Sequence, residues 1–484
     1  MAKKMLSFVS TQQHYPHKRD ADDRNDDFGE IYDEFDPDAA EEQASRCSQC
    51  GIPFCQVHCP LGNHIPDWLR LTAEDRMEEA YEIASSTNNM PEICGRICPQ
   101  DRLCEGNCVI EKGFKSVTIG SVEKYITETA WENGWIKPIT PRREREESVG
   151  VIGAGPAGLA AAEEMRKSGY QVHVYDRYDR AGGLLIYGIP SFKLEKDVVD
   201  RRTVRLKDSG ITFHMNFEVG RDATLAELRE KHDVVLIATG VYKARGLKCP
   251  GIGLGNIQEA LPYLTASNRK GLGDTVPDFE SGALNAEGKN VVVIGGGDTA
   301  MDCVRTAVRQ GAKSVKCLYR RDRANMPGSA REVANAEEEG VEFVWLSGPE
   351  AFVGDDNDKV KAVKAYRMRL GAPDATGRQT PERVPDSSFT LDCDLAIMAL
   401  GFEPEELPAM FGVPELRVTR WGTITVDHDS MMTNLPGVFA AGDIVRGASL
   451  VVWGIRDGRD AATAMKAYIK DRKAEQAETG AAVA

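Results

Sequence analysis

Long apolar runs are absent from this sequence. The longest stretches, such as residues 234–238 (Val-Val-Leu-Ile-Ala), have the length of a β-strand, whereas a membrane span needs roughly 20 apolar residues. Residues 1–10 contain two lysines but no apolar segment of the length found in signal peptides. We therefore expect a cytoplasmic protein without membrane contact, whose cysteines stay reduced.

An excess of positive charge is also missing. The chain has 60 Lys and Arg against 75 Asp and Glu, which gives a formal net charge of −15 and a pI near 5.2. A chain of this charge repels phosphates, so we expect no nucleic-acid partner. Its 484 residues, 42% hydrophobic and 28% charged, are enough for about three globular domains.

The second part of the chain lacks a close pair of cysteines. After residue 145 only four cysteines remain, and none of them has the CxxC or CxxxxC spacing. A disulfide reductase needs two neighbouring thiols, so the sequence excludes this activity. We interpret the four as small buried side chains: Cys249, Cys303, Cys317 and Cys393.

The other eight cysteines lie between residues 47 and 108 and form two sets of four with short spacings. In a reducing compartment such sets predict structural zinc or iron–sulfur clusters. We favour two [4Fe–4S] clusters, because the first run ends in Cys-Pro and resembles a ferredoxin run whose fourth cysteine binds the other cluster. This crossing assigns the ligands as Cys47, Cys50, Cys55 and Cys108 for one cluster, and Cys59, Cys94, Cys98 and Cys104 for the other.

The first 145 residues show helical periodicity and few strand signals. Apolar residues recur at helical spacing over residues 65–84 and 121–135. Ser121 is the expected N-cap of the second helix, and Gly134 is its expected end. We therefore expect a small helical domain that contains the cysteine clusters.

An acidic stretch covers residues 20–42. One interpretation is a solvated tail. The other is a docking arm, because four apolar side chains stand among the charges at i, i+3, i+4 and i+7. These residues are Phe28, Ile31, Tyr32 and Phe35.

Beyond residue 147, strand-like runs alternate with helical segments, which is typical of α/β domains with parallel sheets. The first unit places Gly153, Ala154, Gly155, Pro156 and Gly158 between a strand and an Ala-rich helix. This GxGxxG context predicts a dinucleotide site in which the helix N-terminus binds a pyrophosphate. The next strand ends at Asp176, 23 residues after Gly153, where a carboxylate can bind ribose hydroxyls.

A second unit of the same type begins at residue 290. Its turn and first helical residues are Gly295, Gly297, Asp298, Thr299 and Ala300. The strand that follows ends in Arg320 and Arg321 instead of an acid, with Arg323 nearby. Guanidinium groups bind a 2′-phosphate, so we expect this site to prefer NADPH over NADH.

Two further segments resemble motifs of two-dinucleotide-binding flavoproteins. Residues 238–240 (Ala-Thr-Gly) and residues 442–443 (Gly-Asp) each follow an apolar strand. The resemblance implies that Gly240, Gly442 and Asp443 contact FAD, and residues 180–183, with Gly182 and Gly183, match the flavin-contacting stretch of these proteins. It also implies a discontinuous FAD domain over 146–280 and 400–484, split around an NADPH domain over 281–399. The helical pattern and the cysteines predict the preceding helical iron–sulfur domain over 1–145.

Several longer segments, taken together, are similar to the small (β) subunits of bacterial NADPH-dependent glutamate synthases. They are residues 26–32 (DDFGEIY), 94–108 (CGRICPQDRLCEGNC), 187–194 (YGIPSFKL), 295–302 (GGGDTAMD) and 442–446 (GDIVR). The resemblance implies an FAD protein that oxidises NADPH and sends electrons through two [4Fe–4S] clusters to a large (α) subunit. The FMN of that subunit would reduce 2-iminoglutarate, made from 2-oxoglutarate and glutamine-derived ammonia, to glutamate.

The chain itself lacks the synthase parts. Ala2 follows Met1 where an amidotransferase often has a nucleophilic cysteine, and no segment remains for a (β/α)₈ barrel. Hydride transfer to a flavin depends on positioning more than on a side-chain acid or base, so we assign no catalytic residue. We expect that this chain alone makes no glutamate.

Other functions use a similar module. The enzymatic alternatives are an NADPH:ferredoxin oxidoreductase or transhydrogenase subunit, and the electron-input part of a dihydropyrimidine dehydrogenase. The presence of all eight cysteines favours the glutamate synthase interpretation, since the dihydropyrimidine enzyme resembles this region with one cysteine ligand replaced. An alternative of another class is an NADPH-responsive binding protein stabilised by zinc.

Overall fold

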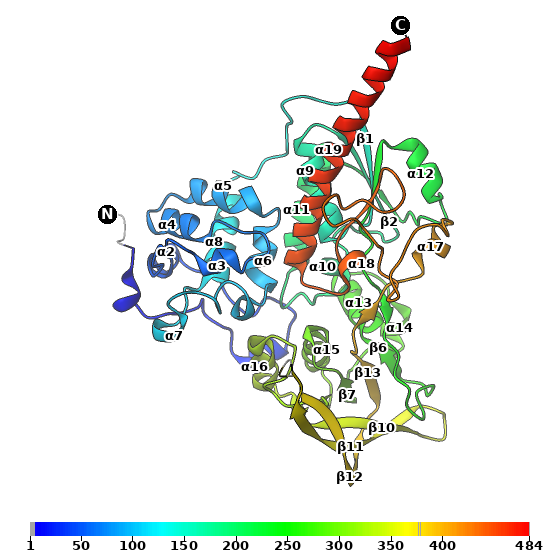
Figure 1. Ribbon diagram of the computed structural model, residues 1–484. Helices are drawn as coiled ribbons and strands as arrows, with labels where there is room; N and C mark the ends of the chain where they lie inside the picture. The colour runs from blue at the N-terminus through cyan, green and yellow to red at the C-terminus, as the bar shows by residue number, and fades with distance from the viewer. Residues whose placement is uncertain (1–4, 376, 378, 484) are drawn as a thin grey trace.

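The computed structural model describes residues 5–375, 377 and 379–483. A helical unit formed by the N-terminal residues lies beside two five-stranded sheets with flanking helices (Figure 1). The expected α/β class, preceded by a helical region, is confirmed. Among the described residues, no helix combines the length and apolar composition that a membrane crossing requires.

The helical unit is built around fully buried side chains such as Trp68, Leu69, Val122 and Ile126. Its helices are η1 (Ser7–Val9), α1 (Ala21–Asn25), α2 (Pro37–Ser45), α3 (Phe54–Val57), α4 (Ile65–Ala73), α5 (Met77–Thr87), α6 (Pro91–Ile97), η2 (Gln100–Arg102), α7 (Glu111–Phe114) and α8 (Ile119–Glu132).

Two helix predictions for this unit need correction. The helix expected over residues 65–84 is two helices, α4 and α5, because the chain turns between them with Asp75 at a φ of +57°. The helix expected from Ser121 begins earlier, at Ile119, and Thr118 takes the N-cap position. It ends at Glu132, two residues before Gly134, whose φ is +66°.

The acidic N-terminal stretch packs against the rest of the molecule. The side chain of Arg24 is 2% exposed and donates to Glu338 at 2.8 Å and to Glu339 at 3.0 Å, more than 300 positions along the chain. Ile31 and Phe35 are also buried, and the ring of Phe28 lies 6.3 Å from that of Phe192. The stretch is therefore a docking arm, and the solvated-tail interpretation is wrong. Its apolar residues lie outside any helix, so their spacing does not correspond to one face of a helix.

The first sheet contains the strand that precedes the first glycine loop. Its strands are all parallel, in the order β15-β4-β1-β2-β3. They are β1 (Ser148–Ile152), β2 (Gln171–Asp176), β3 (Thr212–Met215), β4 (Val234–Ile237) and β15 (Val438–Ala440). The accompanying helices are α9 (Pro156–Lys167), α10 (Leu184–Tyr187), α11 (Lys196–Asp208), α12 (Leu225–Lys231), α17 (Leu407–Met410), α18 (Asp443–Arg446) and α19 (Val451–Val483).

The second sheet contains the strand that precedes the second glycine loop. Its parallel strands lie in the order β6-β13-β7-β8-β9. They are β6 (Ile257–Glu259), β7 (Asn290–Ile294), β8 (Ser314–Leu318), β9 (Glu342–Val344) and β13 (Leu395–Met398), with helices α13 (Ala260–Gly271), α14 (Pro277–Glu280), α15 (Asp298–Arg309) and α16 (Ala330–Glu338). β6 joins this sheet although it precedes residue 281, where we placed the start of the NADPH domain.

Two small antiparallel sheets complete the fold. One has the order β10-β11-β12, with β10 (Ser347–Gly354), β11 (Val360–Pro373) and β12 (Gln379–Asp392), and lies at the end of the molecule opposite the C-terminus (Figure 1). The other pairs β5 (Lys243–Ala244) with β14 (Phe402–Glu403), where the chain passes between the two large sheets.

Candidate dinucleotide and cluster sites

A cavity with about 650 Å³ of empty volume opens at the carboxyl edge of the first sheet. This edge is where α/β proteins bind their ligands. The cavity contains seven of the predicted FAD-binding residues: Gly153, Gly155, Pro156, Asp176, Gly240, Gly442 and Asp443. Segments from four separate parts of the sequence, after β1, β4 and β15 and at the end of β2, therefore meet at one site.

The glycines of the first loop are required by close backbone contacts. Gly153 has a φ of +108°, and a Cβ there would lie 2.3 Å from the carbonyl oxygen of Ala238. A Cβ on Gly158 would lie 1.9 Å from the carbonyl oxygen of Gly153. A Cβ on Gly155 would meet nothing within 4 Å, so its backbone is open to a ligand at the N-terminus of α9.

The flavin-contacting stretch predicted at residues 180–183 lies directly against this loop. The backbone N–H of Gly182 donates to the carbonyl of Ala154 at 2.8 Å. Gly183 has a φ of +56°, and a Cβ there would lie 2.9 Å from the Cα of Gly155. The structure therefore brings the two predicted segments together.

The cavity also presents polar groups. The carboxylate of Asp176 accepts backbone N–H bonds from Ala154 at 2.7 Å and Tyr178 at 2.9 Å, while burial raises its pKa. Burial raises the pKa of Asp443 to about 6, although Ser449 donates to its carboxylate. The hydroxyl of Thr239 is buried without a hydrogen-bond partner among the described residues. Unpaired buried hydroxyls are rare, so Thr239 suits a cavity that takes a polar ligand such as FAD.

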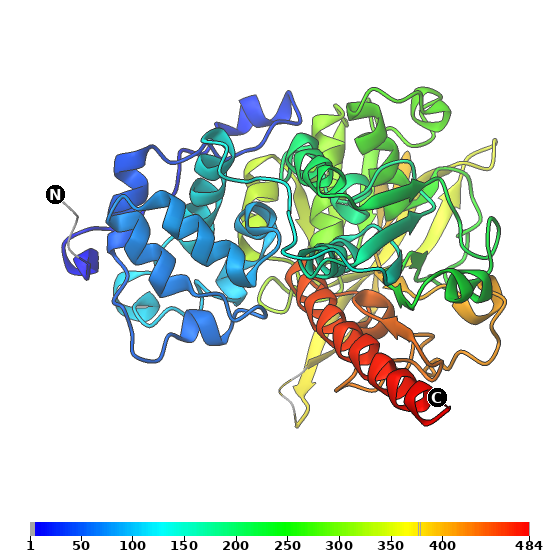
Figure 2. The ribbon, with the colours of Figure 1, turned by 90° about the horizontal axis from the view of Figure 1, so that it is seen from above.

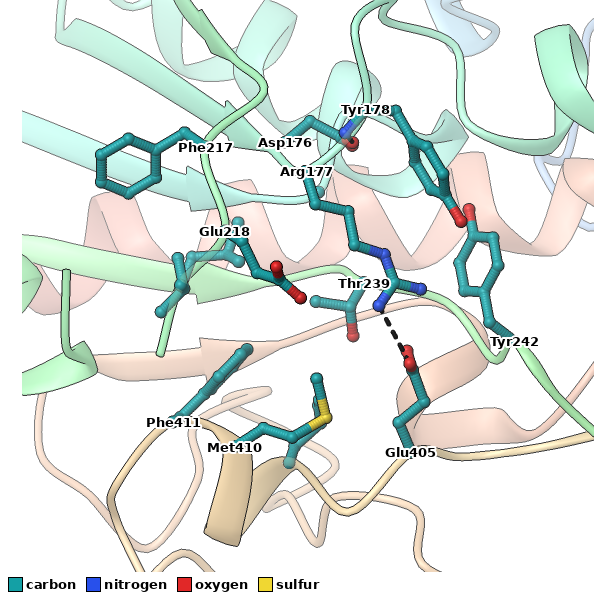
Figure 3. Close-up of a pocket in the computed structure, with 14 residues that line it drawn as sticks. Asp176, Arg177, Tyr178, Phe217, Glu218, Thr239, Tyr242, Glu405, Met410 and Phe411 are labelled. Atoms are coloured by element: carbon teal, nitrogen blue, oxygen red, sulfur yellow. Dashed lines mark hydrogen bonds and ion pairs between the residues drawn. The ribbon is translucent and has the colours of Figure 1, made fainter. Parts of the chain in front are cut away.

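A second pocket continues from this cavity and shares Gly153, Asp176, Thr239 and Tyr242 with it. Figure 3 shows the guanidinium of Arg177 pointing to Glu405, at 2.9 Å, and the rings of Tyr178 and Tyr242 beside it. The sequence analysis missed Arg177, Tyr242 and Glu405. Only Arg177 had a local signal, because it directly follows Asp176 at the strand end.

The second glycine loop repeats the geometry of the first. A Cβ on Gly295 would lie 2.2 Å from the carbonyl oxygen of Ala399, while the space in front of Gly297 is open. Asp298, Thr299 and Ala300 form the first turn of α15, in which Ala300 is fully buried and Asp298 accepts the backbone N–H of Ser329 at 2.9 Å. This loop is therefore also accessible at a helix N-terminus.

Two arginines follow β8, as predicted, and both are available to a ligand. Arg320 is exposed, and Arg321 is half-buried with an Nε that has no hydrogen-bond partner. Neither side chain forms an ion pair within the described part of the chain. Arg323 differs, because it pairs with Glu337 at 2.7 Å. The donor set at this strand end thus fits a 2′-phosphate through Arg320 and Arg321.

Four cysteines surround one cavity of the helical unit, which has about 390 Å³ of empty volume. They are the predicted second set, Cys59, Cys94, Cys98 and Cys104. The rest of the lining combines apolar side chains, including Trp68 and Leu103, with the polar residues Asn63, Asn88, Gln100 and Glu123. Four thiols around one cavity fit an iron–sulfur cluster.

The other four cysteines also lie near one another. Burial raises the pKa of Cys55 to about 12, and the nearby thiols of Cys108, Cys47 and Cys50 add to this rise. Within the described residues, no three His, Cys, Asp or Glu side chains are arranged to hold a single metal ion. Four grouped thiols fit the predicted iron–sulfur cluster.

Comparisons with known proteins give separate family matches for the N-terminal region and for most of the remaining chain. Residues 24–135 match a family model described as dihydropyrimidine dehydrogenase domain II, 4Fe-4S cluster. Residues 147–466 match the pyridine nucleotide-disulphide oxidoreductase family. The FprA protein of Mycobacterium tuberculosis, solved in complex with NADPH, has a similar fold, with a TM-score of 0.58 and 19% identity over 69% of this chain and 86% of its own.

Curated relatives match over almost the whole chain. The glutamate synthase [NADPH] small chain of Azospirillum brasilense is 69% identical, over 96% of this chain and 97% of its own. The protein of the same name from Escherichia coli K12 is 43% identical, over 97% and 100%. A putative oxidoreductase of E. coli, AegA, is 44% identical over 92% of this chain and 68% of its own. The chain therefore belongs to the glutamate synthase [NADPH] small-chain family of oxidoreductases.

Proposed function

We propose that this chain is the electron-input subunit of a glutamate synthase. It would oxidise NADPH at a bound FAD and send the electrons through two [4Fe–4S] clusters to a large subunit that carries FMN and makes L-glutamate from 2-oxoglutarate and glutamine. One observation carries the proposal: Leu450 and Val451 line the dinucleotide cavity of the first sheet, and the next residue, Val452, lines the cavity of the four cysteines.

The proposed binding residues form two groups, one for each dinucleotide. The loop Gly153–Gly158, with Asp176, Gly182, Gly183, Gly240 and Asp443, would hold FAD. The loop at Gly295–Ala300, with Arg320 and Arg321, would hold NADPH. Bound FAD would supply the step from a two-electron hydride donor to one-electron carriers. The chain contributes binding and orientation, which is the larger part of catalysis in hydride transfer.

The adjacent positions of Val451 and Val452 in the two cavities also suggest the order in which the two cysteine sets receive electrons. Val452 touches the cavity of Cys59, Cys94, Cys98 and Cys104, so this set would receive electrons first. The set of Cys47, Cys50, Cys55 and Cys108 would receive them second and deliver them to the partner.

The surface beside the second-receiving set suits a protein partner. Residues 47–66 contain no Asp, Glu, Lys or Arg in a chain that is 28% charged. Ile52, Phe54 and Val57 in this stretch are 69%, 48% and 65% exposed. Exposed apolar groups without charges are typical of the centre of a protein interface. A large subunit that docks here would be next to the Cys47 set.

Anaerobic purification of the untagged chain from its own host tests the proposal. We expect a brown protein with flavin and iron–sulfur absorbance that NADPH bleaches, together with a large FMN-containing partner. A colourless protein with stoichiometric zinc would refute the electron-transfer function. A ferredoxin or a pyrimidine-reducing subunit as the partner would leave the cofactors in place and refute the role in glutamate synthesis.

A further inference from the structure

Helix α19 touches both candidate redox sites at its N-terminal end. Val451 and Gly454 line the dinucleotide cavity, and Val452, 2% exposed, lines the cavity of the four cysteines. In both Figure 1 and Figure 2 this end of the red helix lies beside the helical unit, while its other end points away from it. The position of α19 therefore affects both cavities.

α19 is held tightly against α9, the helix of the first glycine loop. A Cβ on Gly458 would lie 2.2 Å from the carbonyl oxygen of Ala157, so the two helices approach at backbone distance. Asp457, on the same turn, accepts both Nε and an NH2 group of Arg446 at 3.1 and 2.6 Å. With these contacts, α19 keeps a fixed position relative to the dinucleotide cavity.

Two arginines that flank Asp457 and Gly458 reach from α19 to the helical unit. Arg456 donates to the carbonyl oxygen of Pro60 at 2.6 Å, and Pro60 directly follows Cys59. Arg459 donates to the side chain of Asn89 at 2.8 Å and to the carbonyl oxygen of Ser86 at 3.0 Å. Both arginines therefore hold segments that lead into cysteines of the same cavity.

The segment held by Arg459 is connected to a cysteine by one further residue. Asn88, beside Asn89, accepts the backbone N–H of Met90 at 3.0 Å, and its side-chain oxygen lies 3.8 Å from the sulfur of Cys94. Asn88 also donates to the buried Glu123, which lines the cysteine cavity. A displacement of residues 86–89 would thus move the wall of that cavity.

We infer that Arg456 and Arg459 are positioning residues that set the distance between the bound flavin and the cluster held by Cys59, Cys94, Cys98 and Cys104. The inference rests on the proposed function. Electron tunnelling slows steeply with distance, so a clamp between the two sites governs the transfer between them. Neither arginine lines the dinucleotide cavity. Arg459 also donates to Glu164 of α9 at 3.2 Å, but Glu164 lies near the end of α9 opposite the glycine loop, so the clamp is not expected to act on the reduction of the flavin by NADPH.

The test uses the full chain with its cofactors and the double variant Arg456→Ala/Arg459→Ala. Stopped-flow absorbance follows flavin reduction by NADPH, and freeze-quench electron paramagnetic resonance follows cluster reduction. We expect flavin reduction at the original rate and cluster reduction slowed roughly tenfold or more, as for other misplaced reacting groups. Hydrogen exchange should increase at the amides of residues 59–63 and 86–90.

Two further variants control the experiment. Asp460→Asn removes the exposed ion pair of Arg456, at 2.7 Å, but leaves its bond to Pro60, so cluster reduction should keep its rate. Arg456→Lys keeps one hydrogen-bond donor at this position. Combined with Arg459→Ala, it should give faster cluster reduction than the double alanine variant. If the double variant does not fold, the single variant Arg456→Ala should still slow cluster reduction.

Three outcomes would overturn the inference. One is cluster reduction at the original rate in the double variant or in Arg456→Ala. Another is an equal loss in the rates of flavin and cluster reduction, since this indicates general disruption instead of positioning. The third is no cluster signal in the unsubstituted protein, which would refute the proposed function and the clamp with it.

Discussion

The preference for NADPH should depend on two arginines that have no other duty in the fold. Arg320 is exposed, Arg321 is half-buried with an unpaired Nε, and neither forms an ion pair within the described residues. Replacement of both by alanine therefore breaks no ion pair or side-chain hydrogen bond among the residues that the structure describes. The effect on the nucleotide can be read separately from any effect on stability.

The expected size of this effect follows from the bonds that would be lost. A hydrogen bond to a charged group contributes about 1.5–3 kcal/mol. At about 1.4 kcal/mol per factor of ten, loss of one such contact lowers kcat/KM for NADPH roughly 10- to 150-fold. NADH has no 2′-phosphate, so its kcat/KM should change less than about threefold, on the scale of ordinary surface substitutions of ±0.5 kcal/mol.

The assay is steady-state reduction of ferricyanide with either nucleotide, for Arg320→Ala, Arg321→Ala and the double variant. Arg323→Ala is the matched control, because Arg323 is also exposed but pairs with Glu337 at 2.7 Å. An equal loss for NADPH and NADH would refute the assignment. So would a loss in Arg323→Ala as large as that in Arg321→Ala.

Three other predictions concern binding and stability. Gly158→Ala should abolish FAD binding, seen as loss of flavin absorbance, because its Cβ would lie 1.9 Å from the carbonyl oxygen of Gly153. Glu339→Ala should lower the free energy of unfolding in urea by about 3–5 kcal/mol, because it leaves three arginines, among them the fully buried Arg305, without their shared carboxylate. Burial lowers the pKa of His232 from 6.5 to about 4, so the unfolded chain takes up a proton at a higher pH than the folded one. Thermal unfolding should therefore show that stability is lost as the pH falls from about 6.5 to about 4. The loss should be smaller in His232→Gln.

Each of these predictions can fail in a defined way. Normal flavin content in Gly158→Ala would show that the loop can widen. A loss in Glu339→Ala no larger than that in Glu337→Ala, whose exposed carboxylate pairs with Arg323, would show that the buried cluster contributes little. Parallel pH profiles for His232→Gln and the unsubstituted chain would show that His232 does not titrate differently on folding.

Local chemistry was predictable because neighbouring residues determine it. The strand–glycine–helix turns at Gly153 and Gly295 were found from their spacing alone, and the structure shows the close contacts that require glycine there. The resemblance to a ferredoxin run, whose fourth cysteine crosses to the other cluster, predicted the second cysteine set; its four members line one cavity although they come from segments on both sides of α4 and α5. Arg320 and Arg321, which the structure leaves free for a ligand, were likewise predicted from their position directly after one strand.

Longer-range features were not predictable in this way. Nothing near Tyr242 or Glu405 in the sequence indicates that they meet Arg177 beside the first glycine loop. The apolar residues of the arm indicated docking by their spacing, but the sequence did not show where they dock: they are buried or half-buried in an irregular segment that Arg24 attaches to α16. Packing against distant residues decided these positions, and no local periodicity records it.

The sequence by itself determined the chemical inventory: two dinucleotide loops, eight clustered thiols, a pair of arginines at one strand end, and no paired cysteines beside the flavin site. These properties belong to short segments whose backbone geometry is dictated by their own residues. Only the tertiary structure decided how the sites connect, because the contact of Arg456 with Pro60 joins residues 396 positions apart. Such contacts hold α19 between the two cavities, so that adjacent residues of this one helix line the dinucleotide cavity and the cysteine cavity.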